Sequence, residues 1–169
     1  MPRLVIMSGL PGSGKSTLSR RLAERTGAEL VRIDVFEQDL RNAHGAGFDV
    51  GTKGYERGYK LAARHLKDGR DVIADAVNAV EPARQGWRDV AAKTGADLVE
   101  IEIVCSDADE IRTRLETRET GIAGLAPVPF EAVQARHWDP NPNAPKRLDT
   151  AGRGIEACTG DLQKLAGLP

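Results

Sequence analysis

Short apolar segments recur along the chain, and each is followed by a longer stretch of helical or irregular character. The segments lie at residues 4–7, 30–33, 71–74, 98–104 and, with a weaker pattern, 147–149. Segments of this length are typical of β-strands, and strands that alternate with helices are typical of a parallel sheet wrapped by helices. The pattern therefore predicts an α/β fold built on a five-stranded parallel sheet.

Apolar residues at helical spacing predict the elements between the strands. One helix is expected to begin at Ser106, with Asp109 placed to complete a capping box. The last helix is expected from about Gly154, and its spacing turns Ile155 and Cys158 toward the core.

Two glycine-rich stretches interrupt this alternation. Residues 42–54 are expected to form a flexible connection after the second strand. Residues 120–129 combine glycine with proline directly after an arginine-rich helix end, which is typical of a movable lid. We predict a lid at about residues 117–130 within a single domain, residues 1–169, which is long enough to bury a core.

The first apolar segment is followed by the run GLPGSGKST at residues 9–17, which matches the pattern G-x-x-x-x-G-K-[ST]. A strand, a glycine-rich turn and a helix start in that order predict a cradle for phosphate groups, and the Gly-Lys-Ser triplet argues against a plain connecting turn. Glycines let the backbone approach an anion closely, and the helix start adds free N–H donors. Lys15 is expected to bind the β- and γ-phosphates, and Ser16 to bind Mg²⁺. The expected nucleotide contacts are Gly9, Gly12, Ser13, Gly14, Lys15, Ser16 and Thr17.

Acidic residues are expected at the carboxyl ends of the second and third strands, the edge that faces the ligand crevice in open α/β sheets. Asp34 could accept the proton of an acceptor hydroxyl, or it could cap the helix expected from Val35. Asp75 could hold Mg²⁺ through water, with Asn78 in the following loop, or both could form turns with their own backbone. We favour catalysis for Asp34 and metal binding for Asp75 together with Ser16. The predicted substrate-binding residues are Asp34, Arg41, Asp75 and Asn78.

Arginines are the remaining candidates. Arg114 and Arg118 lie on one helix face immediately before the predicted lid. They could clamp phosphates or stack on adenine, and solvated pairs with nearby glutamates are the alternative. We predict nucleotide contacts for both and a catalytic role for Arg118, because it adjoins the lid. Arg41 could orient an acceptor or pair with Asp39 on the surface.

The charge balance is nearly neutral, with 24 Lys and Arg against 25 Asp and Glu and a net charge of −1. No overall basic field would attract nucleic acid or an anionic membrane, although a local basic patch stays open. The chain shows neither a charged-then-apolar leader nor an apolar run near the roughly 20 residues that span a bilayer. These features predict a cytoplasmic protein without a membrane partner.

A phosphate cradle alone does not separate a kinase from a GTP switch, a motor or a transporter ATPase. The chain has no N-K-x-D or T-K-x-D element for reading guanine and no L-S-G-G-Q signature of transporter ATPases. A small kinase needs an acid that activates the acceptor, a second acid near Mg²⁺ and an arginine on a lid. Asp34, Asp75 and Arg118 are candidates for these roles, and together they favour a kinase.

With these residues, the chain resembles the small P-loop kinases around gluconate kinase, adenylylsulfate kinase, chloramphenicol phosphotransferase and the polynucleotide 5′-hydroxyl kinases. The resemblance rests on GLPGSGKST at 9–17, RIDVF at 32–36, VIADAVN at 72–78, RLETR at 114–118 and LDTA at 148–151. It implies a three-layer P-loop NTPase fold with strand order 2-3-1-4-5, ATP with Mg²⁺, and transfer to an acceptor hydroxyl. It further implies that Asp34 is the general base, Arg118 a lid arginine, and residues 148–152 part of the adenine wall.

Two departures from the relatives leave the acceptor open. The chloramphenicol enzymes have a proline near the position of Arg41, and polynucleotide kinases usually place an arginine closer behind the acidic residue. Our hypothesis is an ATP- and Mg²⁺-dependent phosphotransferase that acts on a hydroxyl of a small molecule. The alternatives are a polynucleotide 5′-hydroxyl kinase and a regulatory protein that binds ATP without catalysis. The sequence does not fix the oligomeric state.

Overall fold

The computed structural model describes residues 1–143 and 145–169. Its strands are β1 (Arg3–Ser8), β2 (Glu29–Arg32), β3 (Val72–Asp75), β4 (Asp97–Val104) and β5 (Lys146–Asp149). Its helices are α1 (Lys15–Thr26), α2 (Ile33–His44), α3 (Lys53–Lys67), α4 (Glu81–Thr94), α5 (Ala108–Glu116), α6 (Phe130–Gln134) and α7 (Ile155–Ala166). Neighbouring strands are parallel, in the order β2-β3-β1-β4-β5. The α/β class and the strand order confirm the predictions.

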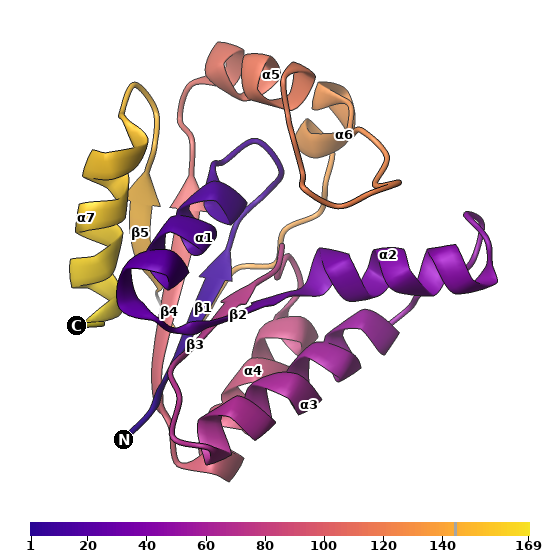
Figure 1. Ribbon diagram of the computed structural model, residues 1–169. Coiled ribbons are helices and arrows are strands. Elements are labelled where there is room, and N and C mark those ends of the chain that lie inside the picture. The colour runs from indigo at the N-terminus through magenta and orange to yellow at the C-terminus, as the bar shows by residue number, and fades with distance from the viewer. Residues whose placement is uncertain (144) are drawn as a thin grey trace.

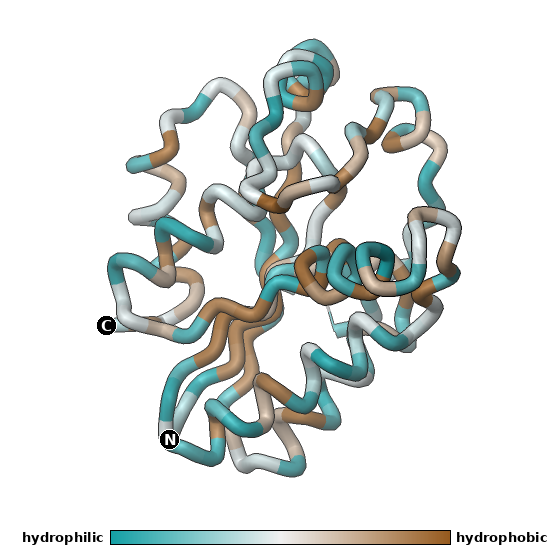
Figure 2. Tube along the Cα trace, turned by 45° about the vertical axis from the view of Figure 1, so that its right-hand side comes forward, coloured by the Kyte–Doolittle hydropathy of each residue, from teal (hydrophilic) through white to brown (hydrophobic). Residues whose placement is uncertain are grey.

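Helices cover both faces of the sheet (Figure 1). Leu4 and Ile6 belong to the core on the side of α3 and α4, whereas Val5 and Met7 belong to the core on the side of α1 and α7. Burial on both faces explains the uninterrupted apolar runs of the central strands β1 and β3. Figure 2 shows the hydrophobic residues gathered in the strands, with polar residues spread over the helices. Within the described ranges, no helix has both the length and the apolar character needed to cross a bilayer.

Residues 117–129 form an irregular connection between α5 and α6, at the place of the predicted lid. Both helices lie at the carboxyl end of the sheet, at the top of Figure 1. The connection contacts the end of β2, where Arg32 Nη1 donates a hydrogen bond to the carbonyl of Thr120 at 3.2 Å. The stretch therefore lies across the strand ends, and its movement stays a prediction.

The boundary between β2 and α2 differs from the predicted one. β2 ends at Arg32, which pairs with Asp75, the last residue of β3. Because β3 offers no further partner, the chain turns into α2 at Ile33. Asp34 is therefore the second residue of α2 and does not end the strand.

Two helix predictions also need correction. α5 is capped by Asp107, whose side chain accepts hydrogen bonds from two amides of the first turn. The amide of Ser106, the predicted cap, donates instead to Asp149 Oδ1 at 3.1 Å, which ties the end of β4 to β5. At the start of α7, Cys158 is buried as predicted, but Ile155 is 48% exposed.

Candidate active site

The glycine-rich loop connects β1 to α1 at the carboxyl end of the sheet. Gly12 and Gly14 have φ angles of 85° and 93°, in the left-handed region that strains residues with a side chain. A Cβ atom at Gly9 would lie 2.6 Å from the carbonyl oxygen of Ile103 in β4. The loop's conformation and its close packing therefore both require glycine. Lys15 begins α1, so the free N–H groups of that helix start adjoin the loop.

A cleft of about 460 Å³ opens over this loop. Its walls come from the loop, the starts of α1 and α2, the end of α5 with residues 117–120, and the connection between β5 and α7. The predicted site residues that line it are Gly9, Gly12, Gly14, Lys15, Ser16, Thr17, Asp34, Arg114 and Arg118. Ser13 is buried in the loop. Segments far apart in the sequence thus meet around the predicted cradle.

Asp75 lies behind the loop at the end of β3 and is 3% exposed. The ammonium group of Lys15 forms an ion pair with its Oδ1 atom, and Arg32 Nε lies 3.3 Å from its Oδ2 atom. Burial raises the pKa of Asp75, but the attraction of Lys15, followed by that of Arg32 and the nearby Ser16 hydroxyl, outweighs it and holds the pKa below its usual value of 3.8. Asp75 is therefore a buried carboxylate held between two cations.

Ser16 and Asp75 offer oxygen atoms of the kind that Mg²⁺ prefers as ligands. Lys15 Nζ lies 3.5 Å from the Ser16 hydroxyl, so all three side chains meet at one point. Within the described residues, Asp75 Oδ2 is buried and accepts no hydrogen bond in spite of the nearby Arg32, which is unusual for a carboxylate oxygen. A hydrated cation would supply the missing partner, so the residues fit the predicted metal.

The predicted base and the predicted lid arginine face each other across the cleft. Asp34 lies in the first turn of α2, and Arg118 follows the end of α5. Arg118 Nη2 lies 3.9 Å from Asp34 Oδ2, and both side chains are partly exposed. The N-cap position of α2 is Arg32, so the alternative role of Asp34 as a helix cap is not supported.

Arg41 and Asn78 contact protein groups that were not predicted, and the predicted contact of Arg41 with substrate stays a prediction. Arg41 Nη2 lies 3.9 Å from a carboxylate oxygen of Glu37 on the same helix, and Asp39 is not its partner. Asn78 is fully buried: its side-chain amide donates to a backbone carbonyl of β1, and the indole N–H of Trp87 donates to its Oδ1 atom at 3.0 Å. We therefore assign Asn78 a structural role in place of the predicted contact with substrate.

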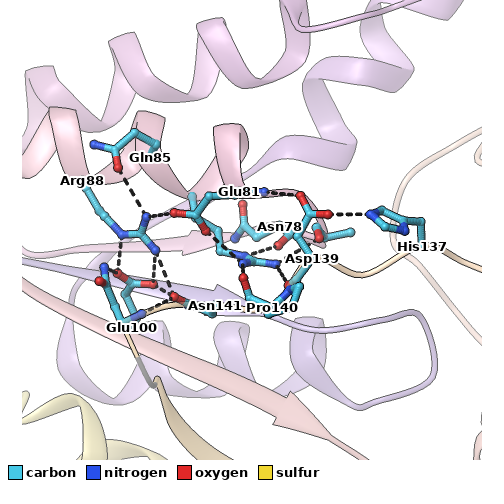
Figure 3. A network of polar contacts seen from close by, with 12 residues as sticks. Asn78, Glu81, Gln85, Arg88, Glu100, His137, Asp139, Pro140 and Asn141 are labelled. Atoms are coloured by element: carbon cyan, nitrogen blue, oxygen red, sulfur yellow. Dashed lines mark hydrogen bonds and ion pairs between the residues drawn. The ribbon is translucent and has the colours of Figure 1, made fainter.

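A polar network that sequence reasoning missed holds the loop after β3 against residues 139–141 (Figure 3). Its centre is Arg84 of α4, which is 1% exposed. Arg84 donates to the carbonyls of Asn78, Ala79 and Pro140 at 2.9 to 3.0 Å. A second arginine of α4 bridges to β4 and to the same segment. The network fixes the loop that follows the buried acid of β3.

Three further arginines line the cleft without having been predicted, namely Arg20 of α1, Arg32 at the end of β2 and Arg153 before α7. Arg20 carried a usable signal, because it lies one helical turn after the Ser16 of the motif. Arg32 and Arg153 had no signal in the sequence beyond their position next to predicted segments. Together with Lys15 and Arg118, they make the cleft cationic in a chain of net charge −1, as suits a polyphosphate ligand.

The fold and the cleft define the class of this protein. A parallel sheet in this order, with a glycine-rich loop that runs from the first strand into a helix start, is the arrangement of P-loop nucleotide-binding domains. A family model described as an AAA domain matches residues 4–137. The chain belongs to this family of AAA domains.

Known proteins resemble the chain in sequence and in fold. An uncharacterized protein of Mycobacterium tuberculosis is 30% identical over an alignment 168 residues long, which covers 89% of this chain and 32% of the relative. This chain therefore spans about a third of that protein's length. The M. tuberculosis APS kinase CysC, solved in complex with AMPPNP and APS, superposes with a TM-score of 0.69 at 20% identity, over 97% of this chain and 96% of that chain. A gluconokinase from Sinorhizobium meliloti superposes with a TM-score of 0.65 at 18% identity, over 98% of this chain and 94% of that chain. At these identities the structures share the fold.

Proposed function

We propose that the protein is a kinase that transfers the γ-phosphoryl group of ATP to a hydroxyl group of a small-molecule acceptor. The observation that carries the proposal is the position of Asp34, which faces Arg118 at 3.9 Å across the mouth of the phosphate cradle. Holding a nucleotide alone does not call for a carboxylate at that point, whereas activating an acceptor does. The activities of the two solved neighbours, an APS kinase and a gluconokinase, support the same class.

The cleft offers a place for each end of the nucleotide. The glycine-rich loop, the start of α1 and Lys15 would bind the phosphates. The base would lie toward the connection between β5 and α7, where Arg153 and the exposed Ile155 line the cleft. An apolar side chain next to a planar guanidinium suits the face of a purine.

Ser16 and Asp75 are the residues that would hold Mg²⁺, Ser16 through its hydroxyl and Asp75 through water. When bound, the ion supplies charge neutralisation at the β- and γ-phosphoryl oxygens. Lys15 now pairs with Asp75, and it would place its positive charge on the same oxygens once a phosphate becomes its partner.

The transfer itself would rest on Asp34 and Arg118. Asp34 orients the acceptor hydroxyl and takes its proton while the hydroxyl oxygen attacks the γ-phosphorus in line with the leaving group. Arg118 and Lys15 stabilise the negative charge on the equatorial oxygens. Residues 117–129 would limit the access of water, which otherwise competes as the acceptor.

Transfer of label from [γ-³²P]ATP in the presence of Mg²⁺ tests this proposal. Acceptors are offered as pools of sugars, nucleosides, aminoglycoside and phenicol antibiotics, and 5′-hydroxyl oligonucleotides. Asp34→Asn should retain ATP binding and lower the transfer rate by about 10²- to 10⁴-fold, the usual range for a lost general base. Asp39→Asn is the matched control, because Asp39 is exposed on the same helix.

Three outcomes would count against parts of the proposal. An Asp34→Asn enzyme that works at the wild-type rate would remove the base assignment. Label that enters only oligonucleotides would favour the polynucleotide 5′-hydroxyl kinase. ATP binding without label in any pool would favour the regulatory protein.

A further inference from the structure

The guanidinium of Arg114 is occupied by protein oxygens, although the residue lines the cleft. Its Nη1 atom donates to the carbonyls of Gly12 and Ser13 at 3.3 and 3.1 Å and to the Thr150 hydroxyl at 2.8 Å. Its Nη2 atom donates to the carbonyl of Thr150 at 3.2 Å and to a carboxylate oxygen of Glu110. The planar fork of the side chain thus bridges the glycine-rich loop and the residue that follows β5.

Thr150 and Glu110 complete this arrangement. Thr150 is 3% exposed, and its hydroxyl donates to the carbonyl of Ser13 at 2.7 Å while it accepts from Arg114. Glu110 accepts from Arg114 with one oxygen and from the amide of Gly152 with the other, at 2.8 Å. We call these three side chains, Glu110, Arg114 and Thr150, the loop clamp.

Apolar packing presses α5 onto the same side of the loop. A Cβ atom at Gly12 would lie 2.9 Å from Ile111 Cγ2 and 3.2 Å from Leu115 Cγ. A Cβ atom at Gly14 would lie 3.4 Å from Arg114 Nη1. Helix α5 and the loop are therefore in direct contact, and the clamp adds directed hydrogen bonds to that contact.

The carbonyl of Ser13 is the point where the clamp acts on phosphate binding. It accepts hydrogen bonds from both Arg114 and Thr150. Because a trans peptide is planar, its N–H points opposite to its C=O. Fixing the Ser13 carbonyl toward Arg114 and Thr150 therefore points the N–H of Gly14 away from these two side chains, and we expect a phosphate to accept from it there.

We propose that Arg114 is a positioning residue that sets the conformation of the phosphate-binding loop through the Ser13 carbonyl and Thr150, and that it is not a direct ligand of the nucleotide. The proposal rests on the proposed function, in that the cleft must bind a polyphosphate. It replaces the prediction that Arg114 contacts the nucleotide. Arg118, which faces Asp34, keeps its predicted role.

Equilibrium binding of ATP and of inorganic tripolyphosphate, each with Mg²⁺, tests this inference on the full chain. The variants are Arg114→Ala, Thr150→Val and the double variant. Thr159→Val is the matched control, because Thr159 is equally buried and its hydroxyl bonds a backbone carbonyl within α7. Affinity is measured per folded molecule, so that a purely structural loss of stability does not change it.

Each single variant should weaken ATP and tripolyphosphate by equal factors, up to about tenfold, because each removes one hydrogen bond to the Ser13 carbonyl, from a charged donor in Arg114 and a neutral one in Thr150. The double variant should lose less than the product of the two factors, because both side chains act on one carbonyl. Thr159→Val should bind both ligands as the wild type does.

Two results would overturn the positioning role. If Arg114→Ala weakened ATP and left tripolyphosphate unchanged, Arg114 would contact the base. If Thr150→Val bound both ligands like the control, the hydroxyl would have no part in shaping the loop. The Thr150→Val measurement tests the proposal even if Arg114→Ala fails to fold. A wild-type protein that binds neither ligand would instead refute the proposed function, and the clamp with it.

Discussion

Replacing Arg84 by alanine tests whether the buried network of Figure 3 holds the loop after β3 in place. Arg84 donates to the carbonyls of Asn78 and Ala79 in buried positions, and to Pro140 at the edge of the network. Its guanidinium carbon also lies 5.5 Å from the ring centre of Trp138, so alanine would remove packing as well as donors.

The expected loss can be worked from these contacts. A buried carbonyl left without a donor costs about 1–3 kcal/mol, and Arg84→Ala would leave the Asn78 carbonyl in this state, whereas the Ala79 carbonyl keeps a hydrogen bond from the amide of Asp139. With the packing against Trp138 lost as well, we expect the free energy of unfolding to fall by about 2–4 kcal/mol. For a chain of this length, that corresponds to a fall of about 10 °C in Tm.

Urea and thermal unfolding, followed by circular dichroism, measure this loss. Arg25→Ala is the control, because Arg25 makes a single exposed ion pair with Glu156 and its loss should cost less than about 1 kcal/mol. If Arg84→Ala were no less stable than Arg25→Ala, water would be able to satisfy the carbonyls, and the network would not fix the loop.

Two further predictions concern carboxylates. Asp75→Asn removes the partner of Lys15 and an expected ligand of the metal. In EDTA, the variant should bind ATP at least as tightly as the wild type does, but the gain in ATP affinity on adding Mg²⁺ should be lost. Titrations with ATP in Mg²⁺ and in EDTA measure both affinities, and an unchanged gain would refute the prediction. Burial, and then the nearby charge of Asp34, raise the pKa of Glu37 above its usual value of 4.5, so its ionisation costs stability as the pH rises through the folded-state pKa. Glu37→Gln should therefore have a higher Tm than the wild type at pH 7, and the difference should vanish below about pH 4.5; a difference that persists there would point to some other cause.

The sheet could be predicted from the sequence because it is parallel and covered on both faces. The central strands β1 and β3 therefore carry apolar runs that stand out from the amphipathic helices, whereas the edge strand β5 is mostly exposed and has only a weak pattern. The strand order has no such local signal, since it depends on how distant segments pair, and it came from the resemblance to known kinases. The end of β2 was misplaced because its length depends on where its partner β3 stops, and the sequence of β2 alone does not contain that information.

The site was predictable to the extent that its chemistry follows from a contiguous motif. The phosphate cradle, Asp34 and Arg118 meet in one cleft as expected. Asn78 and Arg114 show the limit, because a polar side chain can face either a ligand or the protein, and only the tertiary contacts decide. Asn78 turned out to satisfy its neighbours in the core, and Arg114 bonds the carbonyls of the loop.

The contact between Lys15 and Asp75 links the proposed ligands to each other. Both side chains are nearly buried, so each needs a partner of opposite charge, and breaking the pair without replacement would leave an uncompensated charge inside the protein. ATP alone would supply a phosphate to Lys15 but would leave Asp75 with Arg32 as its nearest cation. ATP together with Mg²⁺ supplies both partners at once, a phosphate for Lys15 and a hydrated cation for Asp75. If the proposed function holds, we therefore expect nucleotide and metal to bind jointly more tightly than either one alone, with the charge of Asp75 making the two interdependent.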